Sequence, residues 1–259
     1  MTALREPGAT GEVVYGRNPV LALLQAAERR TDEVAVLVGA SGPLGEVVAL
    51  ARRAGVKVSY RTREQLTAIA GSPRHQGAVA RVAAAPYADV EKLLGIADER
   101  GEAALLLAVD QIQDPRNLGA ILRSADALGA HGVILAKHHQ VGLTGAVART
   151  AMGALGAVAV ARETNLVATL EKLKKSGVWV YGGAIDGGIP PWDADLTGRI
   201  CLVLGSEGEG LRPLVARTCD AVLTIPMAGR VGSLNVAAAA AVLFYEVRRQ
   251  RRGRMPKSP

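Results

Sequence analysis

The fold is decided by the stretch Leu105-Leu-Leu-Ala-Val-Asp-Gln-Ile-Gln-Asp-Pro-Arg-Asn-Leu-Gly-Ala-Ile-Leu-Arg-Ser-Ala-Asp-Ala-Leu-Gly129. It opens with an uninterrupted apolar run of strand length, typical of a strand buried on both faces. After a polar connection, apolar residues recur at helical spacing over Leu118–Leu128, and Gly129 is suited to end the helix. The stretch therefore predicts one strand and one helix of an α/β fold.

The same rhythm of strand and helix continues to the end of the chain and predicts a second domain over residues 104–250. Further short apolar runs are candidate strands, namely Val133–Leu135, Ala157–Val160, Val178–Tyr181, Ile200–Leu204 and Val222–Ile225. Strands that alternate with helices favour a parallel sheet covered by helices on both faces.

The N-terminal part predicts a smaller α/β domain over residues 12–84. Its candidate strands are Val34–Val38, Val56–Tyr60 and Ala78–Ala83, and its candidate helices lie around Val20–Arg29 and Leu44–Ala54. Pro86 and the charged stretch Glu91–Glu102 then indicate a linker over residues 85–103 that contains a short helix. Residues 251–259 form a basic tail.

Length and composition exclude several classes of protein. The 259 residues are 49% hydrophobic and 21% charged, which is ordinary for a globular chain. The longest apolar runs, Ala103–Val109 and Val236–Phe244, are shorter than the roughly 18 residues that cross a bilayer, and the N-terminus lacks the pattern of a signal peptide. Cys201 and Cys219 have neither disulfide-framework nor zinc-site spacing, so we expect a cytoplasmic protein without a metal.

The charge of +7 is concentrated at the C-terminus. Residues 246–259 carry six Lys or Arg against the single acidic Glu246. These cations either bind phosphates or form a solvated end.

The adjacent His138 and His139 are weak candidates for a metal site, because the side chains of adjacent residues point apart. We expect a surface loop there. With 3% aromatic residues, a stacking platform for single-stranded RNA is not expected.

Three segments concentrate glycine and isolated polar residues at the ends of predicted strands, where an open α/β sheet places its ligand crevice. They are Asp110–Arg123, Gly205–Leu211 and Ile225–Val236. The glycines of Gly205-Ser-Glu-Gly-Glu-Gly-Leu211 would let backbone amides approach a ligand closely, although an isolated turn of this kind is more often a plain loop. Its glycine order also differs from the dinucleotide-binding fingerprint.

The polar residues of these segments also have structural explanations. Asn117 is a candidate cap of the following helix, Arg123 a solvated charge, and Ser233 a cap of the long apolar helix after it. Six residues separate Asn117 from Arg123, about 240° around a helix, so the two cannot share a face. Asn235, at the start of that apolar helix, needs a partner if it is buried.

Taken together, the three segments resemble the motifs of the SpoU (TrmH-like) branch of the SPOUT RNA ribose 2′-O-methyltransferases. The matching stretches are Asp114-Pro-Arg-Asn-Leu-Gly-Ala-Ile-Leu-Arg-Ser-Ala125, Leu202-Val-Leu-Gly-Ser-Glu-Gly-Glu-Gly-Leu211 and Ile225-Pro-Met-Ala-Gly-Arg-Val-Gly-Ser-Leu-Asn-Val236. The first domain is similar to the family's RNA-binding module, related to ribosomal protein L30e. Val14-Tyr-Gly-Arg-Asn-Pro-Val20 and His75-Gln-Gly-Ala-Val-Ala80 carry that similarity.

The resemblance implies S-adenosylmethionine as cofactor, held in a deep C-terminal trefoil knot, with the active site at a homodimer interface. The cofactor-binding residues it implies are Leu204, Gly205, Glu207, Gly210, Ile225, Met227, Ser233, Leu234 and Asn235. The catalytic residues are Asn117, Arg123, Glu207, Ser233 and Asn235, and the RNA-binding residues are Tyr15, Arg17, Asn18, His75 and Gln76. His75 alternatively has a structural role. Gly232 and Gly156 depart from the family pattern, which commonly has a polar or acidic residue and a Glu there.

The implied reaction is methylation of a ribose 2′-hydroxyl, with a guanosine in the peptidyl-transferase P loop of 23S ribosomal RNA as the expected target. The candidate set lacks a histidine, and a guanidinium is a poor free base. We therefore expect Arg123 to bind the adjacent phosphate and to lower the hydroxyl's pKa electrostatically. Two alternatives remain: a transfer-RNA methyltransferase of the same branch, and an RNA-binding protein that has lost turnover.

Overall fold

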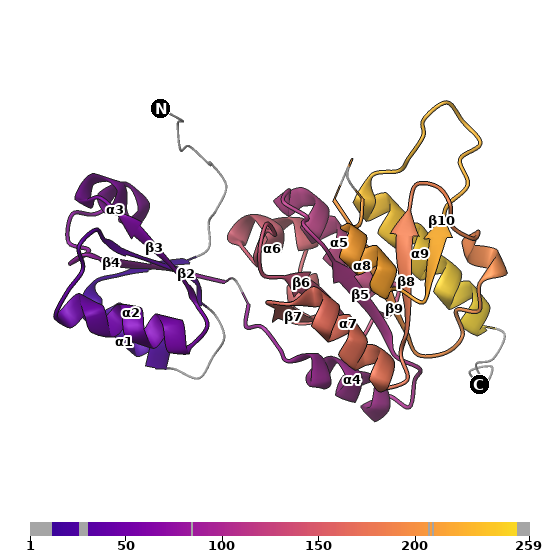
Figure 1. Ribbon diagram of the computed structural model, residues 1–259, viewed down its shortest axis with the longest axis horizontal. Helices are drawn as coiled ribbons and strands as arrows, with labels where there is room; N and C mark the ends of the chain where they lie inside the picture. The colour runs from indigo at the N-terminus through magenta and orange to yellow at the C-terminus, as the bar shows by residue number, and fades with distance from the viewer. Residues whose placement is uncertain (1–11, 26–30, 84, 207, 209, 253–259) are drawn as a thin grey trace. The chain divides into compact units, whose positions relative to one another are not determined.

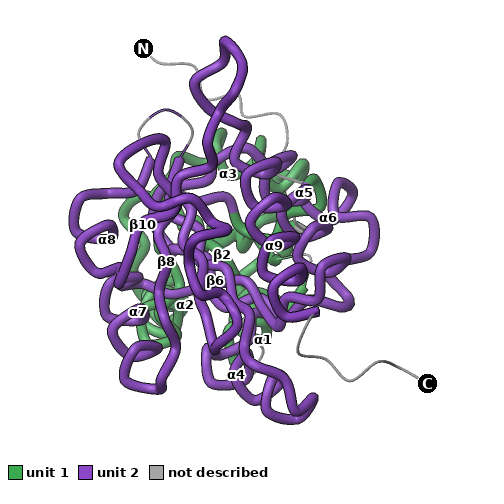
Figure 2. The backbone as a smooth tube through the Cα atoms, turned by 90° about the vertical axis from the view of Figure 1, so that its right-hand side faces the viewer, with its two compact units in different colours: residues 1–86, 142–146 green, residues 87–141, 147–259 purple. Residues whose placement is uncertain are grey.

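The computed structural model describes residues 12–25, 31–83, 85–206, 208 and 210–252, which form two compact units (Figures 1 and 2). Unit 1 comprises residues 1–86 and 142–146, and unit 2 comprises residues 87–141 and 147–259. Among the described residues, no helix has both the length and the apolar character needed to span a membrane.

Unit 1 is a four-stranded mixed sheet with helices on both faces. Its strands are β1 (Glu12–Tyr15), β2 (Thr31–Leu37), β3 (Lys57–Arg61) and β4 (Ala78–Val82), in the order β1-β4-β2-β3, with only β2 and β3 parallel. Helices α1 (Arg17–Gln25) and α2 (Pro43–Arg53) cover one hydrophobic cluster, and α3 (Arg63–Ala70) covers another through Leu66. The three expected strands are confirmed; β1 and α3 were not predicted.

Unit 2 contains the predicted parallel sheet of six strands. They are β5 (Leu105–Val109), β6 (Gly132–Ala136), β7 (Ala159–Glu163), β8 (Trp179–Ala184), β9 (Ile200–Leu204) and β10 (Ala221–Thr224), in the order β10-β8-β9-β5-β6-β7. Every pair is parallel. The expected β7 lies later than predicted, because Ala154–Gly156 form a 3₁₀ turn before it.

Helices cover both faces of this sheet, as predicted (Figure 2). On one face lie α4 (Val90–Glu99), α7 (Leu166–Lys175) and α8 (Pro213–Thr218), whose buried residues join the main hydrophobic cluster. On the other lie α5 (Pro115–Ala127) and α9 (Val236–Arg252), which contact each other, and α6 (Gly145–Ala151) follows β6. Helix α4 falls within the segment expected as a linker, and its Leu93 is fully buried.

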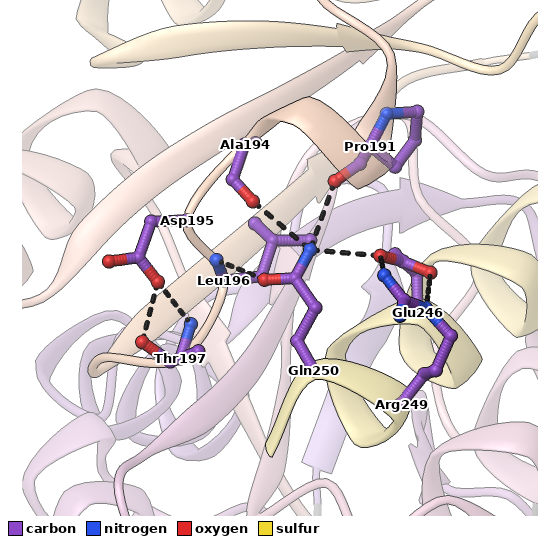
Figure 3. A network of polar contacts seen from close by, with 8 residues as sticks. All are labelled: Pro191, Ala194, Asp195, Leu196, Thr197, Glu246, Arg249 and Gln250. Atoms are coloured by element: carbon purple, nitrogen blue, oxygen red, sulfur yellow. Dashed lines mark hydrogen bonds and ion pairs between the residues drawn. The ribbon is translucent and has the colours of Figure 1, made fainter. Parts of the chain in front are cut away.

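The last turn of α9 is held by polar side chains to the segments that precede β5 and β9. Gln250 Nε2 donates to the carbonyls of Pro191 and Ala194, and Gln250 Oε1 accepts from the Leu196 N–H (Figure 3). Arg251 donates to four carbonyl oxygens, those of Ala103, Ala104, Leu196 and Gly198. The expectation of a basic tail over residues 251–259 is therefore wrong for Arg251, which is an anchored helix residue and is not available to grip a phosphate, whereas residues 253–259 lie outside the described residues.

Candidate functional site

A cavity of about 250 Å³ opens at the carboxyl ends of β8, β9 and β10, beside the start of α9. The residues that line it and that the sequence singled out for a cofactor are Leu204, Gly205, Gly210, Ile225, Met227, Ser233, Leu234 and Asn235. Glu207, the remaining member of that set, lies outside the described residues. The structure thus brings segments from two separate motifs to one pocket.

The wall contributed by β8 was missed by sequence reasoning. Gly183, Ala184 and Ile185 line the cavity, whereas the strand was expected to end at Tyr181. The available signal was the pair Gly182-Gly183 at the end of an apolar run. Glycine is a weak strand former, so the pair looked like the end of the strand instead of a place of close approach.

The glycine turn after β9 is folded so tightly that a side chain cannot fit inside it. A Cβ on Gly205 would lie 1.9 Å from the carbonyl oxygen of Gly210. Ser206 and Gly210 exchange two backbone hydrogen bonds, of 3.1 and 3.0 Å, which close the turn. Gly208 and Gly210 have φ angles of 92° and 68°, in the left-handed region that favours glycine. The turn therefore presents backbone to the pocket.

Two asparagines join α5 to α9 at the edge of the pocket. Asn235 Nδ2 donates to Asn117 Oδ1 at 3.0 Å, and Asn235 Oδ1 accepts from the Ala237 N–H at 2.9 Å. Asn235 therefore caps α9 and contacts α5 at once, although it is exposed, not buried. The capping alternative is wrong for Asn117, because Asp114 accepts from the Arg116 N–H as the cap of α5. It is also wrong for Ser233, because Asn235 supplies the cap.

Arg123 lies apart from this corner. It is exposed on α5 and is not among the residues that line the pocket of its own chain. Six residues along α5 place it about 9 Å from Asn117 along the helix axis and about 240° around it. Within one chain, Arg123 therefore does not line the pocket with Ser233 and Asn235.

The lining of the pocket fits S-adenosylmethionine. Among the described lining residues none is charged, and the polar side chains are those of Ser206, Ser233 and Asn235. Ser206 Oγ is buried and has no hydrogen-bond partner within the described part of the chain. A buried hydroxyl without a partner is costly, so a ligand with polar groups would relieve it. Apolar walls suit the adenine ring and methyl group, and exposed glycine backbone suits its ribose and amino-acid groups.

The residues expected to bind RNA in unit 1 divide into two groups. Gln76 Oε1 accepts from the Arg17 N–H, Arg17 Nε donates to Asn18 Oδ1, and Tyr15 is partly exposed on the preceding strand. These four therefore form one surface at the end of β1. His75 is only 1% exposed, accepts from the Gly77 N–H through Nδ1 and contacts Thr67 through Nε2. Burial and these two contacts support the alternative structural role of His75, and its contact with RNA stays a prediction.

The other histidines and the cysteines are away from the pocket. His138 and His139 are exposed in the loop after β6. His131 is buried, accepts from the Leu105 N–H through Nδ1 and contacts Glu102 through Nε2; burial lowers its pKa despite that carboxylate. Burial also raises the pKa of the Cys219 thiol to about 11. Within the described ranges, no group of three or more His, Cys, Asp or Glu could hold a metal ion.

Comparison with known families matches both units. The family model described as "SpoU rRNA Methylase family" matches residues 104–245, and that described as "RNA 2'-O ribose methyltransferase substrate binding" matches residues 13–88. Together the two matches cover most of the chain.

Individual relatives and solved structures agree with these matches. A 23S rRNA (guanosine-2'-O-)-methyltransferase RlmB of Coxiella burnetii is 40% identical over 94% of this chain and 97% of its own length. The SpoU methyltransferase AviRb of Streptomyces viridochromogenes, solved with AdoMet, aligns with a TM-score of 0.59 and 27% identity over 93% of this chain and 90% of its own. A TrmH/SpoU tRNA modifying enzyme of A. aeolicus aligns with a TM-score of 0.54 and 25% identity, over 63% of this chain and 84% of its own.

Proposed function

Because the chain belongs to the SpoU rRNA methylase family, we propose that it transfers a methyl group from S-adenosylmethionine to a ribose 2′-hydroxyl of a guanosine in 23S ribosomal RNA. The observation that carries this proposal is the pocket at the ends of β8, β9 and β10. This pocket suits the cofactor through its glycine backbone, its apolar lining and its three polar side chains. Asn117 and Asn235 form a hydrogen bond at its edge.

The residues of the chain have separate tasks in this reaction. When bound, S-adenosylmethionine supplies an electrophilic methyl group on a positive sulfonium. The glycine turn and Ser206 hold the cofactor, and Ser233 and Asn235 hydrogen-bond the cofactor and the target ribose. Asn117 fixes the Asn235 amide through the 3.0 Å hydrogen bond between them. Short side chains of this kind set geometry and do not take protons.

Activation of the hydroxyl falls to Arg123. A guanidinium keeps its proton at neutral pH, so it acts by binding the phosphate next to the target ribose and by stabilising the developing oxyanion. The proton leaves to phosphate or water. Glu207 is the acidic residue of the motif, and we assign it to the same site from the resemblance alone.

Arg123 reaches this site in a homodimer. It is exposed on its own chain and faces away from Asn117. The outer face of α9 supports a second copy as its partner, because Val242 and Tyr245 are 41% and 63% exposed there. Mixing an Arg123→Ala chain with an Asn235→Ala chain tests this: half of the dimers would be mixed, each with one intact site, and about a quarter of full activity would return. No recovery would place Arg123 in its own chain's site.

The C-terminal part of unit 2 forms a deep trefoil knot in this proposal. Its support is the course of the chain after β10, which leaves one edge of the sheet and returns to its centre. There α9 contacts α5 and β9, and Arg251 binds the carbonyls before β5. Such a knot brings the two glycine-bearing segments to one pocket.

Ribosomal RNA is favoured over transfer RNA by how much of the chain each relative covers. The 23S rRNA methyltransferase of Coxiella burnetii matches both units, whereas the tRNA modifying enzyme of A. aeolicus matches 63% of the chain. Unit 1, which we assign to the L30e-like type, then supplies the RNA-binding surface of Tyr15, Arg17, Asn18 and Gln76. Because ribosomal RNA is the substrate, the protein acts in the cytoplasm.

The decisive experiment maps ribose methylation across all ribosomal and transfer RNA in cells that lack this protein. We expect one 23S guanosine in the peptidyl-transferase region to lose its methyl group, and the wild-type gene to restore it while Asn235→Ala does not. An unchanged ribosomal profile with a lost tRNA methyl group would support the tRNA alternative. If neither RNA changes and purified protein binds no S-adenosylmethionine, the proposed activity is excluded, leaving an RNA-binding protein.

A further inference from the structure

A bidentate ion pair joins Asp110, directly after β5, to Arg212, directly before α8. Arg212 Nη2 lies 2.8 Å from Asp110 Oδ1, and Arg212 Nε donates to Asp110 Oδ2 at 2.9 Å. The Asp110 side chain is 0% exposed, whereas that of Arg212 is 47% exposed. Burying a carboxylate costs free energy unless it is paired, and Arg212 supplies the pairing for Asp110. Neither residue lines the pocket.

The Arg212 end of the pair anchors the glycine turn. Ser206, Gly208 and Gly210 line the pocket, and Arg212 follows them after a single residue, Leu211. The hydrogen bonds between Ser206 and Gly210 close the turn on itself but do not attach it to the rest of the sheet. Leu211 packs against the hydrophobic cluster, and Arg212 adds a directional polar attachment to β5. The pair therefore sets where the turn stands.

The Asp110 end of the pair belongs to the segment that connects β5 to α5, beside the start of α9. The Asp110 N–H donates to the Leu204 carbonyl at 2.8 Å, so this residue continues the pairing of β5 with β9. The same segment then enters α5, where Asn117 accepts from Asn235 at the start of α9. Residues 110–117 thus attach at one end to the glycine turn and at the other to α9.

We propose that Asp110 and Arg212 are positioning residues, which hold the glycine turn in the conformation that binds S-adenosylmethionine and in register with Asn117 and Asn235. The inference rests on the proposed function, because it concerns the same pocket. Two different nitrogens of the Arg212 guanidinium meet the two carboxylate oxygens of Asp110, one through a hydrogen bond and one through an ion pair, and a lysine ammonium cannot reproduce that geometry. The pair therefore acts on cofactor affinity, beyond its contribution to stability.

Calorimetric titration of S-adenosylmethionine into purified full-length variants tests this. Arg212→Met should weaken binding at least about tenfold, or about 1.4 kcal/mol, and Arg212→Lys should fall between it and the wild type. Because Arg212→Met leaves a buried carboxylate unpaired, the double variant Asp110→Asn/Arg212→Met removes the attachment without that charge and should bind as weakly. All titrations are made below the unfolding temperature of each variant.

The matched control is Arg199→Met at the opposite end of β9. Arg199 Nη1 pairs with Asp98 Oδ1 at 3.0 Å, away from the pocket, so its loss should leave cofactor affinity unchanged. Hydrogen exchange of residues 205–211, measured without cofactor, should be faster than in the wild type in every variant that carries an Arg212 substitution, and unchanged in Arg199→Met. Wild-type affinity and wild-type exchange in the double variant would overturn the inference. Failure of the wild type to bind the cofactor would instead refute the proposed function, and faster exchange in the variants would still support the attachment.

Discussion

Gly205→Ala tests whether the pocket depends on a backbone contact that admits no side chain. The added Cβ would stand 1.9 Å from the Gly210 carbonyl oxygen, 2.1 Å from its carbon and 2.5 Å from the Leu211 nitrogen. Ordinary contact begins at 3.4 Å, so the Gly210 oxygen must move by about 1.5 Å. All three neighbours are backbone atoms, which cannot turn aside as a flexible side chain can.

The size of the effect follows from how this crowding is relieved. Overpacking costs about 1–3 kcal/mol. The Ser206–Gly210 turn follows the end of β9, so the shift falls on the turn, against its attachment through Leu211 and Arg212, while the buried strand stays in place. Because Gly208 and Gly210 line the pocket, that shift distorts the binding wall. We therefore expect the affinity for S-adenosylmethionine to fall by about tenfold to a hundredfold, with the chain still folded.

Calorimetric titration of S-adenosylmethionine, with circular dichroism to verify folding, measures this change. Gly232→Ala is the control, because Gly232 lines the same pocket, has no positive φ and would meet nothing within 4 Å of an added Cβ. It should bind as the wild type does. A Gly205→Ala protein with wild-type affinity would refute the reasoning that this backbone contact shapes the pocket.

Three further predictions concern stability. Asn235→Ala should lower the free energy of unfolding by about 1 kcal/mol in urea titration, because it removes the cap of α9, whereas Ser233→Ala should not; equal losses would contradict the assignment. Burial lowers the pKa of His131 in the folded chain below the ordinary value of 6.5. As pH falls below 6.5, the unfolded chain therefore binds a proton on this residue before the folded chain does, and the free energy of unfolding falls. His131→Gln should flatten the decline in melting temperature between about pH 7 and pH 5, and an unchanged slope would exclude this residue as a cause. Arg251→Met should cost about 3 kcal/mol, because four carbonyls lose a charged donor, whereas exposed Arg252→Met should cost almost nothing; similar losses in both would refute the anchoring role.

Local sequence patterns predicted the framework of the fold. Strands β5 and β9 run over the predicted residues, because continuous apolar runs of strand length are buried on both faces of a parallel sheet. The extension of β8 over Gly182–Ala184 and the helix α3 were not predicted. Helix α3 begins at a capping box of Thr62 and Gln65, a signal that was present but lies in a short segment with one fully buried apolar residue.

The candidate site was only partly predictable. Glycine-bearing segments after strands pointed to a crevice, but capping could not be assigned from sequence: Asp114 and Asn235 cap α5 and α9, where Asn117 and Ser233 were the candidates. Several polar residues stood near each predicted helix start, and only the actual first turn decides which one faces the free N–H groups. The same holds for Arg251, whose charge suggested a solvated tail although its partners lie before β5 and β9.

The amino-acid order by itself determined most elements of the parallel sheet, because apolar periodicity acts over a few neighbouring residues. Tertiary structure alone decided which side chains meet. Asn117 and Asn235 are 118 positions apart, and Asp110 and Arg212 are 102 apart. Such pairs come into contact only when the order of strands in the sheet brings β5, β9 and the start of α9 to the same edge, and no local pattern encodes that order.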